Sequence, residues 1–127
     1  MKEILTEMNK DTLIKFENNM PFDQIIIIKF GATWCRPCQK IKKLCYDWFN
    51  KLPASITCVD IDIDENLELY CALKNKKMVN GIPALVAYYG IKKDHWFIPN
   101  DSVIGSHEDQ INQFFLRCLD HTLKNRK

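Results

Sequence analysis

Glycine and proline are scarce in this sequence, which contains four glycines and five prolines among its 127 residues. It also has no internal repeat and no low-complexity tract, so nothing in its composition marks a flexible linker. The length is sufficient to bury a core of ordinary size. We therefore expect residues 1–127 to form a single domain.

Long hydrophobic runs are missing as well. The longest apolar burst, IIII at 25–28, is far shorter than the roughly 20 residues that a membrane-spanning helix needs. The first ten residues, MKEILTEMNK, carry acidic residues early and have no apolar run of signal-peptide length. We therefore expect a cytoplasmic protein that is not secreted and makes no contact with a membrane.

An excess of one charge sign is the third missing feature. The sequence has 18 Lys and Arg residues against 16 Asp and Glu residues. Its lysine groups are scattered along the chain, as expected for solvated faces. A balance this close to neutral predicts no surface for a polyanion, so we expect no nucleic-acid partner.

Hydrophobic patterning predicts a β-sheet. The stretch QIIIIKF at 24–30 is β-branched and apolar at successive positions, which is typical of a strand covered on both faces. Residues 55–62 and 83–89 also have strand character. Weaker patterns predict a short edge strand within 3–7 and a further strand near 102–105.

Between these strands the apolar residues recur with the period of a helix. The clearest case spans 36–52, where the apolar residues fall on one helical face and Pro53 follows. Three helix N-termini have candidate capping residues, which are Asn9 or Asp11, Asp64, and a capping box from Ser106 to Asp109. The order of elements predicts an α/β fold, with a central mixed sheet of four to five strands flanked by helices on both faces.

Two cysteines separated by two residues follow the strongest strand, in GATWCRPCQK at 31–40. A helix begins here, so its backbone N–H groups and its dipole should lower the pKa of the Cys35 thiol. We expect Cys35 to be an exposed nucleophile and Cys38, one turn further on, to be a buried resolving thiol. The charge of Arg36 should favour the thiolate and make a Cys35–Cys38 disulfide more oxidising.

A zinc site and a chance pair of core cysteines are the alternative interpretations of this motif. Zinc needs further ligands, but the sequence has no second C-x-x-C and no histidine pair at zinc spacing, so we expect no metal. The other four cysteines are interpreted as reduced thiols. Three of them should be buried and inert, and the fourth more exposed; these are Cys45, Cys58 and Cys118, and Cys71.

Two motifs found together resemble the thioredoxin family. Trp34, Cys35, Pro37 and Cys38 match its W-C-x-P-C, and Gly81-Ile82-Pro83 matches its G-I-P, in which the proline is cis. The resemblance covers roughly residues 2–120 and implies the thioredoxin fold. It also implies a surface for the backbone of a client protein, made by Trp34, Arg36, Pro37, Ile82 and Pro83.

The same resemblance implies a thiol–disulfide oxidoreductase that reduces protein disulfides. Its partners would be disulfide-containing client proteins and a thioredoxin reductase-like electron donor that uses NADPH. The chain itself would be a monomer with no bound cofactor beyond its own Cys35–Cys38 disulfide. Two other functions stay open: a binding module that uses the long 90–102 segment in an assembly, and an oxidase or isomerase favoured by Arg36.

This sequence departs from the family at a buried position. The family commonly has an aspartate six residues before the first cysteine, where it assists proton transfer at the resolving cysteine, and this chain has Lys29. Some members have a lysine where this chain has Asp60, so the two charges are expected to face each other with their signs exchanged. Our hypothesis is that Lys29 lowers the pKa of Cys38 and takes part in proton transfer; alternatively, its side chain extends to solvent and has no chemical role.

Milder departures surround the motif. Gly31 replaces a residue that is often tryptophan, and Lys42 and Lys43 replace a proline that often kinks the following helix. Trp96 and Phe97 form either a partner-binding patch or, as we favour, a cover over the sheet edge.

Overall fold

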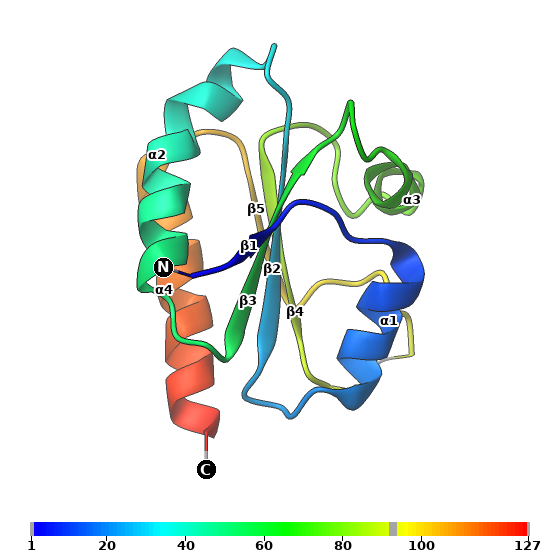
Figure 1. Ribbon diagram of the computed structural model, residues 1–127, viewed down its shortest axis with the longest axis vertical. Coiled ribbons are helices and arrows are strands. Elements are labelled where there is room, and N and C mark those ends of the chain that lie inside the picture. The colour runs from blue at the N-terminus through cyan, green and yellow to red at the C-terminus, as the bar shows by residue number, and fades with distance from the viewer. Residues whose placement is uncertain (1, 92–93, 127) are drawn as a thin grey trace.

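A computed structural model describes residues 2–91 and 94–126 and shows a sheet enclosed between two layers of helices (Figure 1). The sheet has five strands in the order β1-β3-β2-β4-β5. Their bounds are Ile4–Leu5 for β1, Ile25–Gly31 for β2, Ile56–Asp62 for β3, Ala84–Tyr89 for β4 and Asp101–Ile104 for β5. Strands β1, β3 and β2 are parallel, whereas β4 is antiparallel to both β2 and β5. The predicted mixed α/β sheet is confirmed.

The helices cover both faces of this sheet. Their bounds are Lys10–Asn19 for α1, Arg36–Lys51 for α2, Glu68–Asn75 for α3 and Glu108–Asn125 for α4. Helices α2 and α4 lie against one face and α1 and α3 against the other (Figure 1). No helix in the described ranges 2–91 and 94–126 is long and apolar enough to cross a membrane.

Strand β2 is buried along its whole length, which explains its run of isoleucines. Because side chains alternate between the faces of a strand, Ile26 and Ile28 join the core on the α1 and α3 side. Ile25 and Ile27 join the core on the α2 and α4 side. Lys29 continues this second series and therefore points toward α2.

The helix N-termini match the sequence prediction in one case of three. Asn9 caps α1 by accepting a hydrogen bond from the Thr12 N–H at 2.8 Å. Helix α3 begins after Leu67 without a side-chain cap, so the prediction that Asp64 caps it is wrong. The capping box predicted from Ser106 to Asp109 is also wrong, because α4 begins after His107 and its N-terminus has no side-chain cap.

The long segment before β5 packs onto the molecule. Trp96 and Phe97 are partly buried and lie against the core on the α1 and α3 side. The Tyr88 hydroxyl donates a hydrogen bond to the Phe97 carbonyl at 3.1 Å. The pair therefore acts as a cover, as favoured, but what it is seen to cover is the core on this face of the sheet. Residues 92–93 of the segment lie outside the described residues.

Candidate active site

The cysteine pair lies where β2 passes into α2. Cys35 is the N-cap residue of α2, and its Sγ accepts a hydrogen bond from the Cys38 N–H at 3.2 Å. The two residues form a disulfide, with their Cα atoms 5.2 Å apart. Pro37 occupies the first turn, where a helix tolerates the missing N–H. The predicted position of Cys35 at a helix N-terminus is therefore confirmed.

Burial of the two cysteines differs from the prediction. Cys35 is 5% exposed and Cys38 is 2% exposed, so the expectation that Cys35 is exposed is wrong for this disulfide form. The bond to Cys38 draws the Cys35 sulfur against the first turn of α2, where the Cys38 N–H also contacts it. The predicted burial of Cys38 is confirmed.

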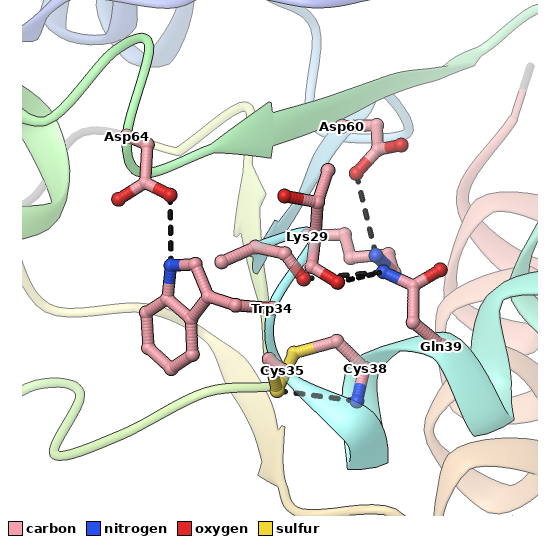
Figure 2. Close-up of a disulfide and its surroundings, with 9 residues drawn as sticks. Lys29, Trp34, Cys35, Cys38, Gln39, Asp60 and Asp64 are labelled. Atoms are coloured by element: carbon pink, nitrogen blue, oxygen red, sulfur yellow. Dashed lines mark hydrogen bonds and ion pairs between the residues drawn. A yellow bond between two sulfur atoms is a disulfide. The ribbon is translucent and has the colours of Figure 1, made fainter.

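Trp34 stands beside the disulfide and is held by a polar contact. Its side chain is 66% exposed, and its Nε1–H donates to Asp64 Oδ2 at 2.7 Å (Figure 2). Asp64 in turn follows Asp62, whose Oδ1 accepts the Asp64 N–H at 2.9 Å. The turn after β3 therefore positions the indole, and this contact occupies the carboxylate that the sequence suggested as a helix cap.

The loop that carries Trp34 is also held from α2. Gln39 Nε2 donates to the carbonyl oxygens of Ala32 and Thr33, at 3.1 and 3.4 Å. Arg36 and Pro37 are exposed at the N-terminus of the helix. They therefore form part of the molecular surface beside the disulfide.

The second motif lies at the same end of the sheet. The peptide bond between Ile82 and Pro83 is cis, as the resemblance implied. The next residue, Ala84, pairs with Phe30 of β2, so Pro83 lies beside the end of the strand that leads to the cysteines. The Gly105 N–H donates to the Pro83 carbonyl at 2.9 Å, which brings the end of β5 to this motif.

Ile104 is a surface residue of this region that the sequence did not single out. It pairs with Ala84 across β4 and β5, and its side chain is 39% exposed. Its position at the end of a weakly patterned strand, next to Gly105, was the available signal. Half-buried and exposed residues alternate along β5, and Ile104 is one of the exposed ones.

Beside the disulfide lies a pair of opposite charges, of which Lys29 is buried and Asp60 is partly buried. Lys29 is 4% exposed, and its Nζ lies 3.4 Å from Asp60 Oδ1 (Figure 2). The two residues are partners in the β2–β3 register. The prediction that they face each other is confirmed, and the Lys29 side chain stays buried. The second Asp60 oxygen, Oδ2, accepts a hydrogen bond from the Tyr46 hydroxyl of α2, a residue that the sequence did not indicate.

The missing side chain at Gly31 explains how Lys29 approaches Cys38. A Cβ atom on Gly31 would lie 3.2 Å from Lys29 Nζ and 3.5 Å from Cys38 Sγ. The ammonium and the sulfur therefore share the space that the missing side chain leaves open. A cavity of about 170 Å³ reaches this space and is lined by Lys29, Gly31, Gln39, Lys42, Asp60 and Glu65 among others.

Three of the four other thiols are buried, and burial keeps them protonated. Burial raises the pKa of Cys45 to about 12 and that of Cys58 to about 11. Burial also raises the pKa of Cys118. Cys71 is exposed, as expected. Among the residues that the structure describes, no cluster of three or more His, Cys, Asp or Glu side chains is arranged to hold a metal ion.

The mixed five-stranded sheet between two layers of helices, with a disulfide at the N-terminus of α2, is the thioredoxin fold. The thioredoxin family model matches residues 5–116, and the chain therefore belongs to the thioredoxin family. Members of this family use their own redox-active disulfide and no bound cofactor. The observed Cys35–Cys38 disulfide agrees with the active-site pair of this family.

Individual relatives resemble the chain at low identity. Thioredoxin 3 of Plasmodium falciparum is 27% identical over 123 residues, which cover 90% of this chain and 64% of that protein. The chloroplastic thioredoxin Y of Oryza sativa is 25% identical, over 72% of this chain and 52% of that protein. The chain thus spans less than two thirds of each of these two curated relatives. A crystal structure of a P. falciparum thioredoxin matches with a TM-score of 0.64 at 26% identity, covering 90% of this chain and 85% of that one.

Proposed function

We propose that this protein reduces disulfide bonds in client proteins through the Cys35–Cys38 dithiol. The observation that supports this proposal most directly is the disulfide at the N-terminus of α2, with Cys35 as the N-cap residue. The first-turn N–H groups and the helix dipole favour a negative charge there, and the thiolate is the nucleophilic form of cysteine.

The reaction has two exchange steps. In the reduced protein, the Cys35 thiolate attacks a client disulfide, forms a mixed disulfide and releases one client sulfur as a thiolate. The Cys38 thiol then loses its proton and its thiolate attacks the Cys35 sulfur. This attack breaks the mixed disulfide, releases the second client thiolate and closes the Cys35–Cys38 bond. Two electrons pass from the dithiol to the client.

Client proteins would bind around the disulfide. We assign this role to the exposed Trp34, Arg36 and Pro37 on one side, and to Ile82 and Pro83 on the other. The exposed side chain of Ile104 extends the second group, since the end of β5 is bonded to Pro83. These residues combine apolar contact with one positive charge.

Lys29 would act on Cys38. An ammonium beside a buried sulfur stabilises its thiolate, because the interaction of charges is strong where water is excluded. The cavity behind Lys29 offers a route to solvent for the proton that Cys38 releases. In this proposal Asp60 is the partner that keeps the buried lysine compensated.

The remaining assignments follow the family. The oxidised pair would be reduced by a thioredoxin reductase-like donor that draws its electrons from NADPH, and the chain would act as a monomer. A cytoplasmic location is supported by four cysteines that stay free in the structure, three of them buried.

Reduction of insulin disulfides with dithiothreitol as the electron source tests the proposed activity. We expect Cys35→Ser to abolish the acceleration seen with the unmodified protein. Cys71→Ser, which removes an exposed cysteine outside the pair, is the matched control and should retain it. An unmodified protein that does not accelerate the reaction would refute the proposal and support the alternative, a binding module with little turnover.

A further inference from the structure

A third residue, Tyr46 of α2, contacts the Lys29–Asp60 pair. Tyr46 donates its hydroxyl hydrogen to Asp60 Oδ2, while Asp60 Oδ1 faces Lys29 Nζ at 3.4 Å. The separation of 3.4 Å is long for a charged hydrogen bond. Asp60 is therefore bonded to Tyr46 and only loosely joined to Lys29, whose ammonium also borders the space next to Cys38.

We propose that Tyr46 is a positioning residue for the resolving step, because its bond to Asp60 limits how strongly that carboxylate neutralises Lys29. This inference deepens the proposed function and rests on the role given there to Cys38. The phenol orients one carboxylate oxygen and draws part of its negative charge away from Lys29. More of the positive charge is then left to stabilise the Cys38 thiolate.

The Tyr46 hydroxyl is suited to a constant donor role. Burial and the bond to Asp60 raise its pKa, so the group stays a phenol over the pH range in which thiols ionise. Its ring packs against Phe49, with the centroids 5.6 Å apart. The ring contact anchors the side chain, and a phenylalanine at this position would keep the contact while losing the hydroxyl.

Other ionisable groups around Lys29 are placed differently. Cys45, also on α2, lies close enough for Lys29 to lower its pKa, but burial outweighs this effect and keeps it a thiol. Lys42 of α2 is exposed at the cavity rim, and Glu65 lies at the rim beyond β3. Asp62 also lines the cavity, and its Oδ1 accepts the Asp64 N–H. Asp60 is thus the carboxylate in contact with Lys29 among the residues that the structure describes.

A single-turnover measurement isolates the resolving step, in which Cys38 attacks the mixed disulfide at Cys35. Thionitrobenzoate is attached to Cys35 as a mixed disulfide at acidic pH, in a Cys71→Ser background that removes the exposed free thiol. After a jump to each test pH, attack by Cys38 forms the Cys35–Cys38 bond and releases the coloured thiolate. The rate against pH reports the ionisation of Cys38, and the assay contains no client protein.

We expect Tyr46→Phe to raise the midpoint of this profile by about half a pH unit. Below the midpoint, release should slow about twofold, since a less stabilised thiolate is also more nucleophilic and offsets part of the loss. Tyr89→Phe is the matched control, because Tyr89 pairs with Ile25 at the opposite end of β2. Its profile should coincide with that of the parent, and urea titrations of both variants show whether stability has changed.

A double-mutant cycle with Lys29→Met decides whether Tyr46 acts through Lys29. The Tyr46→Phe effect should disappear in the Lys29→Met background. An unchanged or lowered midpoint in Tyr46→Phe, or an equal shift in both backgrounds, overturns the inference. Failure of the unmodified protein to reduce insulin would instead overturn the proposed function, while the effect of Tyr46 on Cys38 would still be measurable.

Discussion

Replacing Lys29 by methionine should make Cys38 harder to ionise. Methionine has a similar length and no charge, so the substitution removes the ammonium and keeps a flexible side chain in the buried space. Without the positive charge, the Cys38 thiolate loses its main electrostatic support. We therefore expect the pH profile of the resolving step to move to higher pH.

The size of this shift follows from the geometry around Gly31. Lys29 Nζ and Cys38 Sγ lie 3.2 and 3.5 Å from the same point, so they are at most about 7 Å apart. At that distance and an effective dielectric constant of about 20, two unit charges interact with about 2.4 kcal/mol. This energy corresponds to about 1.7 pH units, from which the nearby Asp60 charge subtracts. We expect a net upward shift of about one unit.

Release of thionitrobenzoate from Cys35 after a pH jump measures this shift. The matched control is Lys43→Met, which removes one positive charge from the exposed face of α2, where Lys43 pairs with Asp47 at 2.9 Å. Below the midpoint, Lys29→Met should release the thiolate about threefold more slowly than the parent. Coinciding profiles for Lys29→Met and Lys43→Met would refute a role of the buried charge at Cys38.

Two further predictions concern stability. Asn9→Ala removes the hydrogen bond to the Thr12 N–H and should lower the free energy of unfolding by about 1 kcal/mol. The control Asn18→Ala, on the exposed face of α1, should change this free energy little. Equal urea midpoints for the two variants would contradict the capping role of Asn9. Burial raises the pKa of Cys45 from 9.0 to about 12, so the folded protein keeps a proton that the unfolded chain loses above pH 9.0. The free energy of unfolding should therefore fall as the pH rises from 9.0 toward 12, and it should fall less steeply in Cys45→Ala. Urea titrations at several pH values measure both slopes. Identical slopes would count against the raised pKa of Cys45.

Local patterns in the sequence predicted the elements that surround the site. The isoleucines of β2 required cover on both faces, and the apolar stripe after Cys35 required a helix. The resemblance to the thioredoxin family implied that Lys29 lies opposite Asp60, which the strand register confirms. The first two inferences succeeded because each depends on the period of one element.

One error arose where a side chain had a choice of partners. Asp64 has the chemistry of a helix cap, but its carboxylate accepts the Trp34 indole N–H instead. Trp34 lies 30 positions earlier in the chain. Sequence patterns describe what a carboxylate can accept, and the tertiary structure determines which donor reaches it.

The sequence by itself determined the order of strands and helices, the place of the two cysteines at a helix N-terminus and the opposed charges of Lys29 and Asp60. Only the tertiary structure brought Tyr46 to Asp60 and showed that Gly31 leaves room for an ammonium beside Cys38. The reason is physical. Periodicity determines the face on which a residue lies, whereas the packing of α2 on the sheet determines which atoms of those faces meet.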